Sequence, residues 1–190
     1  MEHVTVKDLV LGSGGVLVSG SEEAPVSHIR LDSRQVEPGD LFVPLLGERV
    51  DSHRFLPQVM DQGAAAVLTS QELTLPEGGA GCAVIRVEDT KKALQKIGSY
   101  LRDRLTLPLV GVTGSVGKTT TREMIAAALS ARFRVYKTPG NSNSQVGVPV
   151  TLSEITENDQ VGVIELGMSE PGEMTVIANI ARVDLSLIHI

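Results

Sequence analysis

The sequence predicts an α/β protein in two parts: a small N-terminal α/β domain over residues 1–85, then a P-loop domain with a doubly wound parallel sheet over residues 86–190. The first observation behind this is an apolar run, LPLVGV (107–112), followed by a Gly-rich loop, TGSVGKTT (113–120), and a helical sequence. The second is the alternation of short apolar runs with turn sequences in the first part. The Gly-rich stretch at 77–81 indicates the boundary between the two parts.

Two strands and one helix are expected in the first part. LFVPLL (41–46) is typical of a buried strand that Pro44 interrupts, and AAAVLTS (64–70) is typical of a second strand. Between them, HRFLPQVMDQG (53–63) predicts a helix that closes on Gly63. Its core-facing residues are Phe55, Val59 and Met60.

Helices and strands alternate in the second part. Asp89 and Thr90 can cap a helix that runs through Leu101. Its core-facing residues are Ala93, Leu94, Ile97 and Leu101. The Gly-rich loop is followed by a helix, a strand, a turn and a strand, which are TTREMIAAALSA (120–131), FRVYKT (133–138), PGNSNS (139–144) and VGVIEL (161–166).

Composition excludes several classes of protein. The net charge of −6 argues against a broad surface for nucleic acid or anionic lipid, because such partners need an excess of Lys and Arg. Cys82 is the only cysteine, which excludes an intrachain disulfide framework and a cysteine-based zinc cluster. No apolar run approaches the ~20 residues that a membrane helix needs, and the N-terminus lacks a signal-peptide pattern. We therefore expect a cytoplasmic protein without membrane insertion or a nucleic-acid partner.

The Gly-rich loop is the strongest local signal for chemistry. It departs from the general phosphate-loop spacing, because Val112 stands where the first glycine belongs and Gly111 lies one residue earlier. The remaining loop can still turn its amides toward phosphate groups, Lys118 can reach the β and γ phosphates, and the Thr119 hydroxyl can ligate Mg²⁺. A plain Gly-rich turn is the alternative, which the strand and helix on either side disfavour. The predicted ATP-binding residues are Thr113, Gly114, Ser115, Val116, Gly117, Lys118, Thr119 and Thr120.

Glu165 is the predicted second metal ligand, beside Thr119. It ends the apolar run 161–164, and the carboxyl ends of strands in open α/β sheets face the ligand crevice. A carboxylate there can hold Mg²⁺ directly or through water. A solvated edge residue is the alternative, but the apolar run and Gly167 favour a buried acid facing the cleft. Glu170 and Glu173 are instead expected to be solvent-facing residues at a helix start.

With these residues placed, the chain resembles the Mur ligase family over nearly its whole length. The similar segments are LDSRQVEPGDLFVPLLGERVDSHRFLPQVMDQGAAAVLTS (31–70), TGSVGKTTTREMI (113–125), and TPGNSNSQVGVPVTL (138–152) with IELGMSEPGEM (164–174). The third segment, with its Gly-Asn-x-Asn and Gly-x-Pro pattern, resembles the members that add D-alanyl-D-alanine to UDP-N-acetylmuramoyl-tripeptide. One departure is Ser144-Gln145, where those members usually have Asn-Glu.

The resemblance implies further binding residues. Ser33, Arg34 and the 47–53 loop would lie near the uridine diphosphate, and the asparagines after Gly140 near the phosphates or the muramoyl group. The substrate-binding residues implied are Ser33, Arg34, Gly47, His53, Asn141 and Asn143. From the residues alone, a polar turn at 32–34, a structural His53 and turn-forming asparagines remain open.

The resemblance also implies an activity: a cytoplasmic, ATP- and Mg²⁺-dependent amide ligase of peptidoglycan precursor synthesis, monomeric at full length. Its small-molecule substrates would be a UDP-N-acetylmuramoyl-peptide and D-Ala-D-Ala. The substrate carboxylate would be activated as an acyl phosphate, with Lys118 and Glu165 as catalytic residues. Two alternatives stay open: a ligase that adds diaminopimelate or lysine, and a non-catalytic nucleotide-binding module.

Mur ligases usually extend well beyond 190 residues, which carries a further expectation. We expect 1–85 to be the UDP-sugar-binding domain and 86–190 an incomplete, truncated ATP-binding domain, so that the 190-residue chain by itself is inactive. The family's downstream metal-binding His and carbamylated Lys have no match here, and His189 does not lie in that motif. The final LSLIHI (185–190) resembles translated adapter sequence, and we hypothesise that it is not native.

Overall fold

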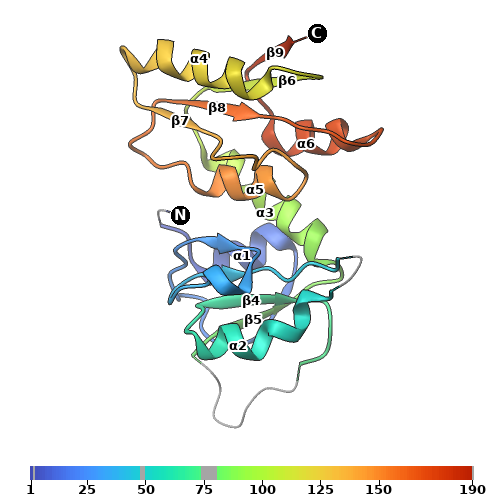
Figure 1. Ribbon diagram of the computed structural model, residues 1–190. Helices are drawn as coiled ribbons and strands as arrows, with labels where there is room; N and C mark the ends of the chain where they lie inside the picture. The colour runs from blue at the N-terminus through green and yellow to red at the C-terminus, as the bar shows by residue number, and fades with distance from the viewer. Residues whose placement is uncertain (2, 48–49, 74–80, 190) are drawn as a thin grey trace. The chain divides into compact units, whose positions relative to one another are not determined.

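A computed structural model describes residues 1, 3–47, 50–73 and 81–189 of the chain. It contains two compact α/β units, Met1–Ile97 and Gly98–Ile190 (Figure 1). The division falls within helix α3 (Thr90–Arg104), later in the chain than the boundary expected near residue 85. The Gly-rich stretch behind that expectation lies outside the described residues, apart from Gly81.

The first unit contains a five-stranded mixed sheet. Its strands, in spatial order, are β1 (Val16–Ser19), β5 (Ala83–Arg86), β4 (Ala66–Thr69), β3 (Leu41–Phe42) and β2 (Ile29–Arg30). Edge strand β1 pairs antiparallel with β5, and all the other pairs are parallel. Parallel strands require crossover connections, and short helices lie in two of them, between β2 and β3 and between β3 and β4.

Short helices complete the first unit. They are α1 (Val6–Ser13), η1 (Ser33–Gln35), η2 (Ser52–Phe55) and α2 (Leu56–Asp61). The helix expected over 53–63 is confirmed as η2 with α2, and the chain turns at Gly63 with a positive φ of 90°. Leu56 and Val59 are fully buried in a cluster with Phe42 of the sheet, and Met60 packs against that cluster. Phe55, which was expected to face this core, is instead partly exposed and lines a pocket. Helix α1 was not expected from the sequence.

Strand β3 is shorter than the expected strand over 41–46. It ends at Phe42, although Val43 and Pro44 are also buried. Proline has no backbone N–H to donate to a sheet, so the ladder cannot continue through Pro44. The carbonyl of Pro44 instead accepts a hydrogen bond from the Thr90 hydroxyl at 2.6 Å. The proline therefore ends the strand and places its carbonyl where helix α3 begins.

The second unit contains the expected parallel sheet. Its strands, in spatial order, are β7 (Val135–Lys137), β8 (Val161–Glu165), β6 (Leu109–Gly114) and β9 (Leu185–His189). The three strands expected after residue 106 are confirmed. Edge strand β9 pairs with β6 from Val110↔Leu185 to Gly114↔His189, and its side chains are exposed. Backbone pairing of this kind does not depend on which side chains the strand carries. It therefore does not test the hypothesis that 185–190 is not native, which stays a prediction.

Helices cover both faces of the second sheet, with α4 (Lys118–Ser130) on one side and α5 (Gly147–Ser153) and α6 (Glu173–Ala181) on the other (Figure 1). Adjacent residues of β8 point to opposite faces: Val163 packs in the cluster with α4, and Ile164 packs in the cluster with α5 and α6. The doubly wound arrangement is therefore confirmed. Among the described residues, no helix combines the length and the hydropathy of a membrane-spanning segment.

Cys82 provides a simple check of the first core. Its side chain is 2% exposed, and burial raises the pKa of its thiol to about 12. Because the thiolate is the reactive form, we predict that Cys82 in the folded protein does not react with a thiol-directed reagent at pH 8. In denaturant, one thiol per chain should react with the reagent, at the rate of an ordinary exposed cysteine. Fast modification under native conditions would contradict the packing of this core.

Candidate nucleotide-binding site

The Gly-rich loop joins strand β6 to helix α4 in the second unit. Gly117 is the residue before the helix and adopts a left-handed φ of 76°, which side-chain-bearing residues adopt only with strain. The turn directs the chain into the 13-residue helix α4, whose first amides have no partner within the helix. A helix start after such a loop favours an anion, because its amide groups and its dipole both carry positive charge.

Lys118 is the first residue of α4, and its ammonium group lies over the loop. It donates hydrogen bonds to the carbonyl oxygens of Gly114 at 2.7 Å and of Ser115 at 3.4 Å. Ser115 and Val116, at the tip of the loop, are exposed. The cation is therefore held near exposed backbone, where a phosphate group can replace the loop carbonyls as its partner.

Glu165 faces this loop from the neighbouring strand. In the parallel pairing of β6 with β8, Glu165 is opposite Val112, just before the loop. Its side chain is only 2% exposed, and its Oε2 accepts a hydrogen bond from the Thr119 hydroxyl at 3.0 Å. Glu165 is thus a buried acid that faces the loop, and not a solvated edge residue.

The Thr119 hydroxyl and the Glu165 carboxylate form a donor set suited to Mg²⁺. Both are hard oxygen ligands, and Mg²⁺ in nucleotide sites is held by one or two protein oxygens together with phosphates and water. The described residues contain no group of three His, Cys, Asp or Glu side chains that could hold a metal. The pair of Thr119 and Glu165 oxygens fits a metal that arrives with a nucleotide.

Arg122 was not predicted from the sequence, yet it contacts Glu165 directly. Its side chain is 5% exposed, and its Nη1 donates to Glu165 Oε2 at 3.1 Å and to the carbonyl of Gly140 at 3.0 Å. Its Nε and Nη2 donate to Glu123 at 3.2 and 2.7 Å. Arg122 follows Thr119 by three residues, so helical periodicity places both on the same face of α4. That spacing is the signal that could have identified it.

Asn143 holds the other oxygen of the same carboxylate. Its Nδ2 donates to Glu165 Oε1 at 2.8 Å, and its carbonyl accepts from the Gly167 amide at 2.8 Å. A Cβ at Gly167 would lie 2.8 Å from Asn143 Cγ, so the Glu-Leu-Gly sequence leaves room for the asparagine. The buried Thr138 hydroxyl accepts from the Glu165 amide at 2.9 Å. Asn141 is exposed, and its carbonyl accepts a hydrogen bond from the Asn143 amide at 2.8 Å.

Ser33 and Arg34 lie in the first unit, at a separate pocket of about 490 Å³. The residues that line it are Leu31, Asp32, Ser33, Arg34, Val50, Ser52, Arg54, Phe55 and Gln58. Arg34 binds the Asp32 carboxylate through its side chain and its backbone amide, which lowers the pKa of Asp32 to about 2. Arg54 lies 4.6 Å from the centre of the Phe55 ring. The pocket combines two arginines, one of them paired with Asp32, with an aromatic face, a composition that can bind an anionic ligand that carries a ring.

His53 and Gly47 do not line that pocket, although both were expected near the uridine nucleotide. His53 is 7% exposed; its Nδ1 lies 2.6 Å from Asp51 Oδ1, and its Nε2 accepts from the Ser70 amide at 3.2 Å. Both ring nitrogens therefore have protein partners, as in a structural histidine. The amide of Gly47 donates to the carbonyl of Val50, and residues 48–49 of this loop lie outside the described part of the chain.

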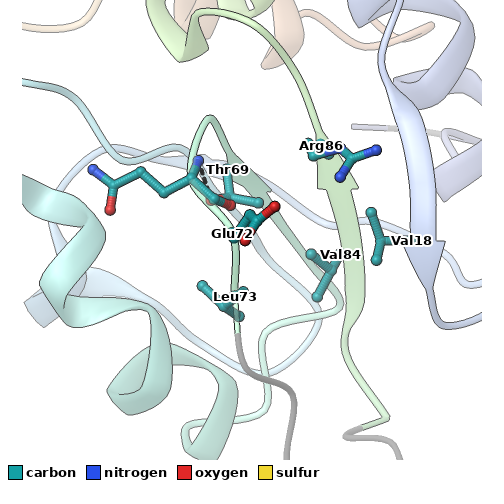
Figure 2. A pocket seen from close by; sticks show the side chains of 7 residues that line it. Val18, Thr69, Glu72, Leu73, Val84 and Arg86 are labelled. Atoms are coloured by element: carbon teal, nitrogen blue, oxygen red, sulfur yellow. Dashed lines mark hydrogen bonds between the residues drawn. The ribbon is translucent and has the colours of Figure 1, made fainter.

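A further hollow of about 240 Å³ lies over strands β4 and β5 (Figure 2). Its labelled side chains include the apolar Val18, Leu73 and Val84 together with Glu72 and Arg86. None of the predicted site residues lines it. The hollow therefore does not belong to either predicted site.

Comparison with known families gives two matches. Residues 25–101 match the family described as "Mur ligase family, catalytic domain", and residues 112–189 match "Mur ligase middle domain". The second match contains the Gly-rich loop and extends through strand β9.

Individual proteins give a consistent result. The UDP-N-acetylmuramoyl-tripeptide--D-alanyl-D-alanine ligase of Bacillus subtilis (strain 168) is 40% identical over 185 residues, 97% of this chain. Crystal structure I of MurF from Acinetobacter baumannii matches 97% of this chain and 40% of its own, with a TM-score of 0.88 and 33% identity. The MurF ligase from Thermotoga maritima in complex with ADP matches 82% of this chain and 35% of its own, with a TM-score of 0.72 and 31% identity. The chain spans 40% of the length of the Bacillus relative.

The contact between Gly167 and Asn143 generates a prediction. We expect Gly167→Ala to lower the free energy of unfolding by about 1–3 kcal/mol, because the new methyl group must displace the Asn143 side chain. Chemical denaturation measures this change. Gly81→Ala is the control, since a Cβ there meets no atom of the described residues within 4 Å, and it should be nearly neutral. Equal stability of the two variants would contradict the close approach.

Proposed function

Because this chain belongs to the Mur ligase family, we propose that it forms the uridine-nucleotide-binding and ATP-binding units of a ligase joining D-alanyl-D-alanine to UDP-N-acetylmuramoyl-tripeptide. Members of this family are ATP-dependent ligases that form C–N bonds. The observation that carries the proposal is the 40% identity, over 97% of the chain, to a protein named for this reaction. The contact of Thr119 with Glu165 beside the loop supports an ATP site in the second unit.

In this proposal the second unit binds the triphosphate. The loop residues 113–120 and the first amides of α4 bind the phosphates, and Lys118 exchanges the carbonyls of Gly114 and Ser115 for phosphate oxygens. Thr119 and Glu165 would hold Mg²⁺, which would neutralise negative charge on the phosphates. These residues position and stabilise charge, and none of them forms a covalent bond with substrate.

The chemistry proposed is an amide synthesis in two steps. A carboxylate oxygen of the tripeptide attacks the γ-phosphorus of ATP, the bond to the bridging oxygen breaks, and ADP leaves with an acyl phosphate formed. The amine of D-Ala-D-Ala then attacks the acyl carbon, inorganic phosphate leaves, and the amine loses a proton. Stabilisation of the phosphoryl charge by Lys118 is the contribution of this chain to the first step.

The first unit binds the uridine diphosphate in this proposal. Arg34 and Arg54 supply positive charge for the diphosphate, Ser33 supplies a hydroxyl, and Phe55 supplies a face for a ring. His53 acts through its bonds to Asp51 and Ser70, which hold the loop that begins at Gly47.

In the second unit, Asn141 and Asn143 lie toward the phosphates or the muramoyl group. We further propose a cytoplasmic, monomeric enzyme of peptidoglycan synthesis, and hence of cell-wall growth and division.

Binding measurements test both sites in the 190-residue chain. We predict that Lys118→Ala weakens ATP binding by tenfold or more, since a charge-assisted hydrogen bond contributes about 1.5–3 kcal/mol. The same variant should bind UDP-N-acetylmuramoyl-tripeptide as the wild type does, and the exposed Lys91→Ala should leave both affinities unchanged. Calorimetric titration gives both constants. A chain that binds ATP without the UDP-sugar would favour the non-catalytic nucleotide-binding module.

Acceptor choice requires turnover. We predict that a chimera, in which residues 1–184 replace the aligned region of the Bacillus relative, releases phosphate from ATP with D-Ala-D-Ala as acceptor. The matched control is the same chimera carrying Lys118→Ala, which should be inactive. Turnover with lysine or diaminopimelate in place of D-Ala-D-Ala would contradict the proposed substrate and favour the neighbouring ligase.

A further inference from the structure

We propose that Arg122 is a positioning residue of the magnesium–nucleotide site, holding the Glu165 carboxylate against Thr119 and linking helix α4 to the segment 138–143. The inference rests on the proposed function of this site in binding ATP with Mg²⁺. It assigns to Arg122 a role beyond an ordinary internal ion pair.

The first step concerns the charge of Glu165. Its carboxylate is 2% exposed, and two of its contacts, with Thr119 and Asn143, are to neutral groups. Arg122 is its one cationic contact among the described residues. A buried carboxylate without an opposite charge is strongly unfavourable, so the guanidinium keeps this acid in its place beside the loop.

The second step concerns the orientation of the Glu165 carboxylate. Arg122 Nη1 and Thr119 Oγ1 both contact the same oxygen, Glu165 Oε2, while Asn143 holds Oε1. The carboxylate is thus fixed by three groups from two segments, and Oε2 is the oxygen that lies next to the Thr119 hydroxyl. Groups that orient a metal ligand affect metal affinity without touching the metal themselves.

The third step concerns the charge that Arg122 retains when a cation approaches Glu165. Arg122 also binds Glu123, whose other oxygen contacts Lys137, so positive and negative groups alternate along this chain of contacts. The guanidinium therefore has a second carboxylate partner, half-exposed, at a site away from the loop. It can remain in place when Glu165 takes a metal, because its own charge stays balanced.

The fourth step concerns the segment 138–143. Arg122 Nη1 donates to the carbonyl of Gly140, between Thr138 and Asn143, which both contact Glu165. One arginine thus holds the carboxylate directly and also holds the segment that binds it from the other side. A planar guanidinium can bind Glu165, the Gly140 carbonyl and Glu123 together, whereas a lysine ammonium at this position cannot reach all three.

The test compares the affinity for a non-hydrolysable ATP analogue in Mg²⁺ with that in EDTA, for the 190-residue chain and its variants. The dissociation constant in EDTA divided by that in Mg²⁺ isolates the metal-dependent part of binding. We expect Arg122→Met to reduce this ratio by about tenfold or more, as loss of a residue that orients a metal ligand does, with a small effect on binding in EDTA. Arg122→Lys should lie between Met and the wild type.

Arg102→Met is the matched control for a structural arginine. Arg102 lies in the same unit and binds the carbonyls of Ala181 and Leu105 as well as the Asp184 carboxylate, away from the loop. We expect it to lower the temperature of thermal unfolding while its Mg²⁺ ratio stays at the wild-type value. This separates loss of stability from loss of metal positioning.

Two results would overturn the inference. A wild-type ratio in folded Arg122→Met would show a purely structural ion pair, with the proposed ATP site intact; if that variant does not fold, a wild-type ratio in Arg122→Lys would show the same. A wild-type chain whose binding does not respond to Mg²⁺ would overturn this inference together with the proposed metal site.

Discussion

The buried carboxylate of Glu165 is the constraint on which the second unit is built. A carboxylate at 2% exposure needs a partner for each of its oxygens, and here the partners come from α4 and from the segment after β7. The parallel pairing of β6 with β8 sets its depth, and Gly167 leaves space for Asn143. The phosphate loop, the helix that follows it and the 138–143 turn are therefore fixed relative to one another through a single side chain.

Much of the fold could be predicted because it follows from local patterns. The apolar runs before the loop and before Glu165 became parallel strands, since such runs are buried on both faces. The short helices α1 and α5 were missed. Helix α5 contains Gly147 and Pro149, and its stability comes from packing in the core with α6. Strand β3 was predicted too long because Pro44 has no backbone N–H with which to continue the ladder, although the residue is buried.

Some residues of the site could be predicted from local patterns, and others could not. Lys118, Thr119 and Glu165 could be identified because the spacing of a phosphate loop and the end of an apolar strand are visible in the sequence itself. Helical spacing could have placed Arg122 on the same face of α4 as Thr119, but not its contacts with Gly140 and Glu165, because these lie far from it in sequence. For His53, the family resemblance implies a place near the uridine diphosphate, which stays a prediction; the structure adds that both of its ring nitrogens have protein partners.

A crystal structure of this chain with Mg²⁺ and a non-hydrolysable ATP analogue tests the central claim most directly. We predict that the phosphates lie against the loop with Lys118 turned toward them, and that the metal lies between Thr119 and Glu165, bound directly or through one water. Arg122 and Asn143 should keep their contacts with the Glu165 carboxylate. A nucleotide bound elsewhere, or a metal held without Thr119 and Glu165, would contradict the account.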